Sequence, residues 1–264
     1  MGMATRDAYG KALVEVGRLY PQVVVLDADL SKSTKTSLFA KEFPDRFFGC
    51  GIAEANMVGI AGGLAAAGKI PFASSFACFL MDKAFDQLRM AVAYPQVNVK
   101  IVVSHGGISI GEDGPSQQSV EDYALACALP GFVVASPADE TATRALVFRA
   151  VEHVGPVFLR VGRPKVPIVY SRKNESFQFG EAKMLLDGSD LTLIGCGLMV
   201  AECIKASEML FAQGISARVL DMHTLRPLDR EAIAAAARET GAIVVAEEHL
   251  LDGGLANVLV NDPA

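Results

Sequence analysis

The sequence lacks the long apolar run that a membrane-spanning helix needs. No stretch reaches about 18 consecutive apolar residues, although 51% of the 264 residues are hydrophobic. It also lacks a charged N-terminus followed by an apolar segment, so we expect no signal peptide. Tryptophan is absent, and no long basic cluster occurs in a chain of formal net charge −6. We therefore expect a cytoplasmic protein with a sizeable core that binds neither membranes nor nucleic acids.

Cysteine and histidine are too scattered to form a disulfide framework or a metal site. The five cysteines include no CxxC pair, and each lies among apolar neighbours. We interpret them as small core residues in a reducing compartment. The four histidines show no metal-ligand spacing, so we expect no metal held by this chain alone. The residues concerned are Cys50, Cys78, Cys127, Cys196 and Cys203, with His105, His153, His223 and His249.

What the sequence does contain is an alternation of short apolar runs and helical patterns. Runs typical of buried strands cover 23–26, 99–103, 132–135 and 157–161, with a further short strand expected at 71–72. Helical patterns cover 54–67, 83–93, 119–128 and 138–152. Apolar strands that alternate with helices are typical of a mostly parallel sheet covered on both faces. We therefore predict an α/β fold with a doubly wound sheet.

The alternation stops after residue 163 and resumes after residue 180. The interval contains two prolines and mixed charges without a sustained period, which indicates a linker between domains, placed at 166–180. Beyond it we expect strands at 191–194, 217–220 and 243–246 and helices at 199–213 and 229–240. The sequence thus predicts two doubly wound domains, 1–165 and 181–264, of which the second is short enough to be abbreviated or incomplete.

Polar residues follow several of the predicted strands. Ligands of open parallel sheets bind beyond the carboxyl ends of the strands, so we expect these side chains to face one edge. The glycine-rich loop after 99–103 is either a solvated surface segment or a functional loop. Its length and its position directly after a strand favour function. The residues in question are Asp27, Asp29, Ser31, Ser33, His105, Glu112, Asp113, Gln117, Arg160 and Arg163.

Glu54 is the one carboxylate in the stretch GIAEANMVGIAGGL. An acid in the first turn of a helix is ordinary, because the helix dipole stabilises it by ~0.3–1 kcal/mol. The surrounding glycines and alanines, however, allow another backbone to approach closely, and a carboxylate in a dry seam needs a specific partner. The residues alone leave both interpretations open. Phe76 and Phe79, which would share one helical face, are either core residues or an apolar wall for a heterocycle.

Several long motifs resemble transketolase. They are GIAEANMVGIAGGLA, PFASSFACFLMDKAFDQLRMA, SHGGISIGEDGPSQQSVEDYALACALPGFVVASPAD and RVGRP, while DMHTLRPLD and VAEEHLLDGGL are similar to the C-terminal domain of that family. The resemblance runs from residue 4 to about residue 254. It implies a pyrimidine-binding domain at 1–165 and a transketolase C-terminal-like domain at 181–264. Related thiamine enzymes, namely 1-deoxyxylulose-5-phosphate synthase and the β subunit of pyruvate-dehydrogenase-type E1, share parts of it, but GEDGPSQ favours transketolase.

The sequence has no GDG…N motif of the kind with which transketolases grip the diphosphate and Mg²⁺. It therefore resembles the C-terminal subunit of a split transketolase. The resemblance implies thiamine diphosphate as cofactor, with Mg²⁺ held by an N-terminal partner subunit that carries the diphosphate-binding domain. It also implies an α₂β₂ heterotetramer, because such domains pair two-fold.

The resemblance implies roles for individual residues. Glu54 matches the catalytic glutamate that hydrogen-bonds N1′ of the aminopyrimidine, and Phe76 and Phe79 match the aromatic wall beside that ring. The residues that match substrate contacts are His105, which we also expect to be catalytic, Asp113, and the sugar-phosphate residues Arg6, Ser33 and Arg163. Gln117 matches a substrate-binding position where many relatives carry histidine, which leaves its role in hydroxyl recognition open.

The function so implied is transfer of a two-carbon ketol group from a ketose phosphate to an aldose phosphate, as in the pentose phosphate reactions. The matches at Arg6, Ser33 and Arg163 favour a phosphorylated sugar over pyruvate as donor. Two alternatives stay open: a subunit of another thiamine enzyme, and a non-catalytic partner that stabilises an N-terminal subunit. The intact Glu54 and the complete glycine-rich loop favour the enzyme.

Overall fold

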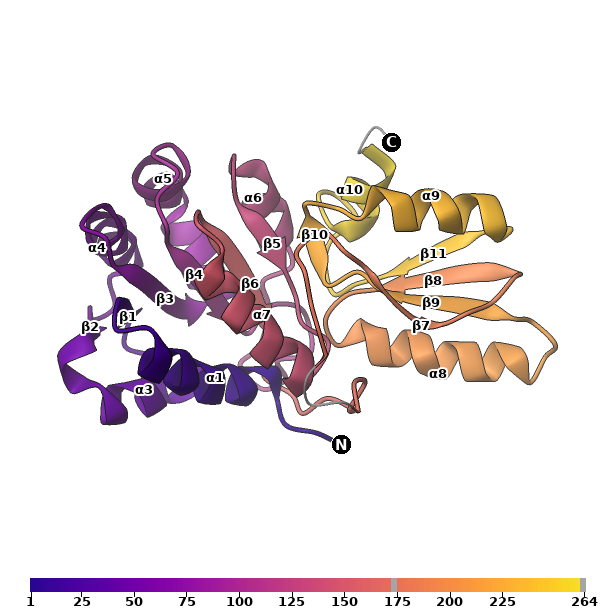
Figure 1. The fold of residues 1–264 in the computed structure, drawn as a ribbon, viewed down its shortest axis with the longest axis horizontal. Helices are drawn as coiled ribbons and strands as arrows, with labels where there is room; N and C mark the ends of the chain where they lie inside the picture. The colour runs from indigo at the N-terminus through magenta and orange to yellow at the C-terminus, as the bar shows by residue number, and fades with distance from the viewer. Residues whose placement is uncertain (172–174, 262–264) are drawn as a thin grey trace.

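The computed structural model describes residues 1–171 and 175–261, which form two α/β units side by side (Figure 1). The parallel strands of the first unit are β1 (Val23–Asp27), β2 (Phe47–Gly49), β3 (Ile70–Phe76), β4 (Lys100–Ser104), β5 (Val133–Ala135) and β6 (Val157–Val161). With β10 (Thr224–Arg226) they form one sheet in the order β10-β5-β6-β4-β3-β1-β2. Strand order and direction confirm the predicted α/β, mostly parallel fold.

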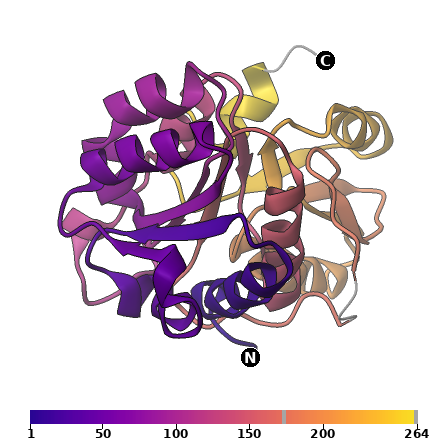
Figure 2. The same ribbon diagram turned by 60° about the vertical axis from the view of Figure 1, so that its left-hand side comes forward.

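Helices cover both faces of this sheet (Figure 2). One face carries α1 (Thr5–Leu19), α3 (Ser37–Glu42) and α7 (Glu140–Glu152), and the other carries α4 (Glu54–Ala66), α5 (Phe85–Gln87) and α6 (Asp122–Ala128). Strand β4 shows why its sequence is continuously apolar. Ile101 and Val103 join the apolar cluster on the α4 side, and Val102 joins the cluster on the α1 side. Alternate side chains thus reach opposite cores.

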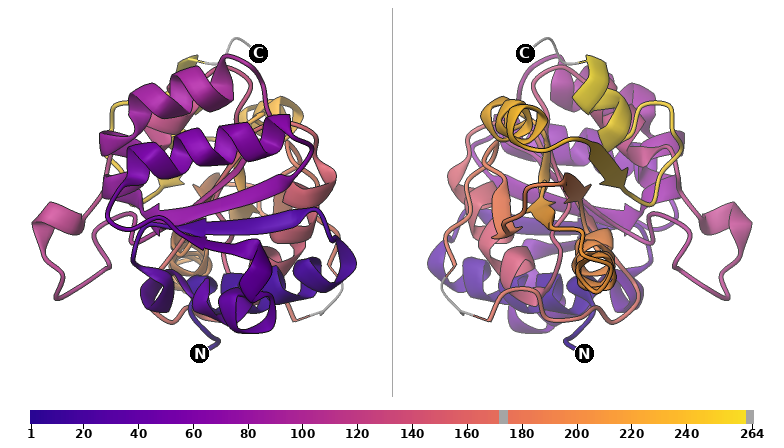
Figure 3. Two further views of the ribbon diagram at one scale, coloured as in Figure 1. Left: turned by 90° about the vertical axis from the view of Figure 1, so that its left-hand side faces the viewer. Right: turned by 90° about the vertical axis from the view of Figure 1, so that its right-hand side faces the viewer.

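The second unit is a four-stranded sheet in the order β11-β8-β9-β7. Its strands are β7 (Lys183–Leu186), β8 (Leu191–Gly195), β9 (Ala217–Asp221) and β11 (Ile243–Ala246), with β7 antiparallel to β9. Helix α8 (Met199–Phe211) covers one face, α9 (Arg230–Glu239) covers the other, and α10 (Leu255–Asn261) lies near β11 (Figure 3). Both β7 and β11 are edge strands within the described residues.

The two units are joined by more than the chain connection. Strand β10, which comes from the C-terminal part of the chain, pairs antiparallel with β5 of the first sheet. The described part of the predicted linker is also packed: Tyr170 and Phe177 are buried, and the Tyr170 hydroxyl donates to Asp221 Oδ2 at 2.6 Å. Residues 172–174 of that linker and 262–264 of the predicted second domain lie outside the described residues.

Some helix boundaries differ from those predicted. Helices α7 and α9 begin one residue after Asp139 and Asp229, whose carboxylates accept from Ala142 N and Ala232 N, both at 2.9 Å. Each aspartate is therefore a cap outside the helix. The segment predicted as one helix at 83–93 is helical, but it is not a single regular α-helix. This segment lies in a broken helix made of a π-helical turn η2 (Cys78–Asp82), then α5, then a second π-helical turn η3 (Leu88–Ala93).

Helix α1 was not predicted, because Gly10 and Gly17 interrupt its helical pattern. A Cβ at Gly10 would come within 2.6 Å of Lys35 Cβ, and one at Gly17 within 2.5 Å of the Phe39 ring. These glycines are required where α1 meets the segment around α3. Strands β2, β7 and β10 were also missed, since three or four residues carry too little periodicity to be recognised.

Candidate functional site

Most of the predicted site residues converge where neighbouring strands of the first sheet end. Strands β1, β3, β4 and β6 are adjacent and parallel. Their carboxyl ends carry, in turn, the short helix α2 (Ser31–Thr34), Phe76, His105 and the turn before Arg163. Arg6 reaches the same place from the first turn of α1. The expectation that polar residues after these strands share one edge therefore holds for this group.

His105 is the centre of the cluster. Its Nε2 lies 3.4 Å from Arg6 Nη1 and 3.8 Å from Asp113 Oδ2, and its Nδ1 lies 2.8 Å from Ser104 Oγ. Its ring stacks on Phe76, with centroids 3.7 Å apart. The imidazole thus joins an aromatic surface on one side to charged groups on the other.

His105 is neutral at physiological pH. Burial lowers its pKa to about 3, and the charges of Arg6 and Arg163 act in the same direction. The contact with Asp113 is therefore not an ion pair at neutral pH. Because Arg6 donates to Nε2, the ring proton belongs on Nδ1, which donates to Ser104 Oγ. The backbone of His105 has φ 62°, a left-handed conformation that a non-glycine residue rarely adopts outside constrained sites.

Two arginines supply the positive charge of the site. Arg6 Nη1 donates to the Ser33 backbone oxygen at 3.2 Å, while its Nε is buried without a hydrogen-bond partner among the described residues. Burial lowers the pKa of Arg6. Arg163 pairs with both Glu112 oxygens, one at 2.9 Å, and its Nε lies 3.6 Å from Asp113 Oδ2. The Arg163 hydrogen bond lowers the pKa of Glu112 to about 2, so this loop carboxylate stays ionised.

Glu54 lies at the other end of the same aromatic surface. It is the first residue of α4 and is 2% exposed. Lys83 Nζ donates to Glu54 Oε2 at 2.7 Å and sits 5.3 Å from the centroid of the Phe79 ring. Phe79 in turn stacks on Phe76 with centroids 5.7 Å apart and planes inclined by 13°. A continuous line of contacts therefore runs from the Glu54 carboxylate through the Lys83 ammonium to the stacked phenyl rings. From there it continues through the His105 imidazole to the two arginines.

The structure corrects the origin of the phenylalanine pair. Phe76 ends β3 and Phe79 lies in the π-helical turn η2, so they do not share the face of one helix. Lys83 was missed altogether, because its approach to Glu54 depends on how the segment after β3 packs against α4. No local signal marks it, because Asp82, Asp86 and Arg89 make a charged residue ordinary in this segment.

Gln117 and Asp27 were predicted at this edge but lie outside the cluster. Gln117 is in the 3₁₀ turn η4 (Pro115–Gln117), where its side-chain oxygen accepts from Ser116 Oγ at 2.6 Å. The loop that carries it projects from the body of the molecule (Figure 3). Asp27 is buried rather than open to the edge, and its carboxylate accepts from Thr34 and Thr36 hydroxyls at 2.7 and 2.8 Å. Asp27 therefore shapes the turn that carries Ser33.

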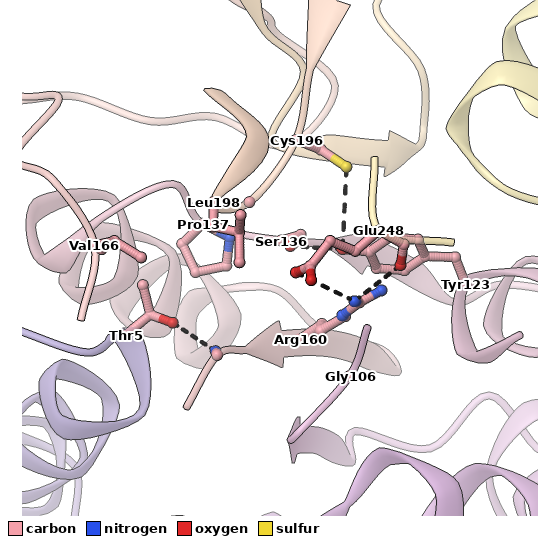
Figure 4. A pocket seen from close by; sticks show the side chains of 12 residues that line it. Thr5, Gly106, Tyr123, Ser136, Pro137, Arg160, Val166, Cys196, Leu198 and Glu248 are labelled. Atoms are coloured by element: carbon pink, nitrogen blue, oxygen red, sulfur yellow. Dashed lines mark hydrogen bonds and ion pairs between the residues drawn. The ribbon is translucent and has the colours of Figure 1, made fainter. Parts of the chain in front are cut away.

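Arg160 was expected at the same edge, and that expectation is wrong. It lies within β6, is 5% exposed, and donates to Asp122 Oδ1 at 3.2 Å and to the Glu248 backbone oxygen at 3.0 Å. Its guanidinium covers the Tyr123 ring at 4.4 Å. Figure 4 shows Arg160, Tyr123 and Glu248 around a pocket of about 20 Å³ at the junction of the two units, which has room for about one water molecule.

The cysteines are unpaired, as expected of core residues. Three of them are buried, whereas Cys50 and Cys127 are only half-buried. Burial raises the pKa of all five thiols, so none is a ready nucleophile at neutral pH.

Metal ligands and membrane segments were sought among residues 1–171 and 175–261. In that part of the chain, His, Cys, Asp and Glu side chains form no group of three or more suited to a metal ion. The helices described there are too short or too polar for any of them to span a bilayer.

Comparison with known proteins shows the family. The chain matches the models for the transketolase pyrimidine binding domain over residues 1–169 and the transketolase C-terminal domain over residues 180–261. It is 47% identical over 251 residues to a protein of Methanocaldococcus jannaschii provisionally described as a transketolase C-terminal section, covering 95% of this chain and 78% of that protein.

Human transketolase is 44% identical over 257 residues, covering 96% of this chain but 41% of that protein, so this chain spans less than half of that relative. A solved split-gene transketolase, described as an inactive β4 tetramer, is 51% identical with a TM-score of 0.92, covering 98% of this chain and 85% of that one. The pyrimidine-binding and C-terminal domain matches account for nearly all of the described residues, and the chain therefore belongs to the transketolase family.

Proposed function

We propose that the chain is the C-terminal subunit of a thiamine-diphosphate-dependent transketolase, which transfers a two-carbon ketol group from a ketose phosphate to an aldose phosphate. The observation that carries this proposal is the line of contacts from Glu54 to Arg163. One end offers a buried carboxylate beside a flat apolar wall, and the other offers arginines at the solvent boundary. A cofactor heterocycle and a phosphorylated sugar need these two environments next to each other.

The residues at the Glu54 end fit an aminopyrimidine. The stacked rings of Phe76 and Phe79 provide a surface for its face, and the Glu54 carboxylate, 2% exposed, provides a hydrogen-bond acceptor for a ring nitrogen. When bound, thiamine diphosphate supplies the carbon nucleophile that takes up and releases the two-carbon unit. Glu54 would hold a proton at the ring nitrogen, which is a general acid–base role. We assign the diphosphate and Mg²⁺ to the partner subunit.

The residues at the arginine end fit a sugar phosphate. A guanidinium fork binds a phosphate through two parallel hydrogen bonds, and Arg163 already binds a carboxylate in this way. Arg6 has a buried Nε that still lacks a partner among the described residues. Neutral His105 presents Nε2 as a hydrogen-bond acceptor, which Arg6 Nη1 occupies at 3.4 Å and which a substrate hydroxyl could use instead. Ser33 completes the proposed phosphate end.

Exposed apolar residues beside Glu54 support a partner subunit. Ile52 is 77% exposed and Ile60 is 39% exposed, and a Cβ added at Gly59 or Gly63 would meet nothing within 4 Å. Such a surface next to a buried carboxylate suits a large apolar interface. We propose that an N-terminal subunit docks here and that the pair assembles two-fold as α₂β₂. The inactivity stated for the related β4 tetramer agrees with a chain that needs such a partner.

The experiment that tests the proposal mixes the chain with an N-terminal transketolase subunit, thiamine diphosphate and Mg²⁺. The mixture is expected to release an aldose phosphate from xylulose 5-phosphate, and neither subunit alone should do so. In the mixture, Glu54→Gln keeps the shape of the side chain but loses the proton, so we expect kcat to fall by about 10²–10⁴-fold.

A matched control separates catalysis from an ordinary helix-dipole effect. Glu231 is also an acid in the first turn of a helix, α9, but it is exposed. Glu231→Gln should leave turnover unchanged. Normal turnover by the Glu54→Gln complex would show that Glu54 is structural, and no turnover by any mixture would favour a non-catalytic stabilising subunit.

A further inference from the structure

Lys83 is the residue at the proposed cofactor site to which neither the motifs nor the proposed mechanism assigns a role. Its ammonium is the one hydrogen-bond partner of the Glu54 carboxylate among the described residues, at 2.7 Å. The same atom lies 5.3 Å from the centre of the Phe79 ring. It therefore stands between the carboxylate and the aromatic wall, which is the place that the proposed function gives to the aminopyrimidine.

The two members of this pair differ in their freedom to move. The Glu54 side chain is 2% exposed and is fixed at the start of a 13-residue helix. The Lys83 side chain is 52% exposed. It follows the π-helical turn η2, and the next residue, Ala84, leaves helical geometry with φ −108° and ψ 15°. A lysine stem has four rotatable carbons, so Lys83 can leave the pair while Glu54 stays in place.

We propose that Lys83 is a placeholder for the cofactor: its ammonium neutralises Glu54 while the site holds no pyrimidine ring, and it leaves the carboxylate when the ring binds. This inference rests on the proposed function. The physical reason is that a buried carboxylate without a partner is costly, so the free chain needs a cation at Glu54. The ring needs the same oxygen and the same face of Phe79, so the two occupants exclude each other.

A placeholder and a permanent cofactor contact predict opposite effects on affinity. Any interaction made in the free state and lost on binding weakens binding, so removing it must tighten the complex. Lys83→Met keeps the length of the stem and removes the charge, whereas Lys83→Arg keeps the charge. Lys69 is the matched control, because it is an exposed lysine near the end of the same α4 segment, and Lys69→Met removes one positive charge.

The test is calorimetric titration of thiamine diphosphate into the assembled two-subunit complex with Mg²⁺. For Lys83→Met we expect the apparent Kd to fall by about three- to tenfold. Lys83→Arg and Lys69→Met should leave Kd within about twofold. A Kd for Lys83→Met that is unchanged or higher overturns the inference, and loss of affinity that arginine restores would show instead that Lys83 holds the bound cofactor.

A second measurement keeps the inference separate from the proposed function. In urea unfolding of the chain alone, Lys83→Met should lower the midpoint, and the same change should have little effect in a Glu54→Gln background, where no charge needs neutralising. If Lys83→Met lowered the urea midpoint equally in the wild-type and Glu54→Gln chains, the placeholder inference would be wrong. If instead the wild-type complex binds no thiamine diphosphate, the proposed function fails first, and this inference fails with it.

Discussion

Arg160 and Arg163 lie three residues apart at the end of β6, yet they occupy opposite environments. The Arg160 side chain is 5% exposed and pairs with Asp122, which is fully buried. The Arg163 side chain is 26% exposed and pairs with Glu112, which is 78% exposed and lies on the projecting loop. Arg160 is enclosed by parts of its own chain, whereas Arg163 is held by a carboxylate that water can replace.

The difference teaches that charge and position after a strand do not by themselves indicate a ligand site. Burial lowers the pKa of Arg160, but the nearby groups, chiefly Asp122, outweigh it and raise the pKa, so the guanidinium stays charged in the junction. Its partners fix the first unit to the segment that carries Glu248. Arg163 has an exchangeable partner, and this is the property that a substrate phosphate requires.

The largest expected effect comes from breaking the buried pair. Arg160→Met would leave the Asp122 carboxylate buried without a cation, so we expect the free energy of unfolding to fall by about 3–5 kcal/mol. Urea unfolding of the purified chain measures this loss. If the single variant does not fold, the double variant Arg160→Met/Asp122→Asn should recover part of the stability, because no charge is then left unpaired. If Arg160→Met lowered the free energy of unfolding no more than Arg163→Met does, the contrast drawn between the two arginines would be wrong.

The second-largest effect is expected from a change at Arg163. It should appear in KM for the substrate rather than in the free energy of unfolding. In the proposed two-subunit enzyme, Arg163→Met should raise KM for a phosphorylated ketose by about 10–100-fold, which corresponds to losing a charged hydrogen-bond pair to phosphate. The urea midpoint of the chain should change little. A donor without phosphate provides the control, since its KM should not respond. Equal losses for both donors would place Arg163 outside the phosphate site.

The smallest expected effect tests whether Glu112 competes with the substrate phosphate for the guanidinium of Arg163. Glu112→Gln should lower KM for the phosphorylated ketose by about two- to fivefold at low salt, because the arginine no longer has to release a carboxylate. The gain should shrink at high salt, where the pair is already screened. Glu42→Gln is the control, since Glu42 is an exposed carboxylate paired with Arg18 on another part of the surface. A rise in KM would indicate that Glu112 supports Arg163 instead of competing for it.

Much of the fold could be predicted because buried parallel strands carry continuous runs of valine and isoleucine. The predicted strands of both units are present, with ends shifted by at most one residue, except that the short strand expected at 71–72 is the longer β3 (Ile70–Phe76). Contacts between the units could not be predicted. Strand β10 has three residues and pairs with β5 across about 90 positions of chain, and no local pattern signals such a pairing.

The candidate site divides in the same way. Residue types and their places after strands were enough to select His105, Asp113 and Arg163, which the structure brings together. The same rule also selected Asp27 and Arg160, which are buried structural groups. Asp27 and Arg160 lie at or inside the ends of β1 and β6, whereas the other three follow their strands. A shift of one or two residues at a strand end, together with the packing of neighbouring segments, therefore separates the two groups.

By itself, the sequence determined the α/β class, the two-unit organisation and the presence of one acid in a glycine-rich helix, because these depend on local periodicity and residue size. The tertiary structure decided what that acid meets. Glu54 meets Lys83, which also lies over the Phe79 ring, because a π-helical break after β3 carries that segment onto the start of α4. Burial, pairing and the choice between a structural and an exchangeable partner arise from contacts between distant segments, which no local pattern encodes.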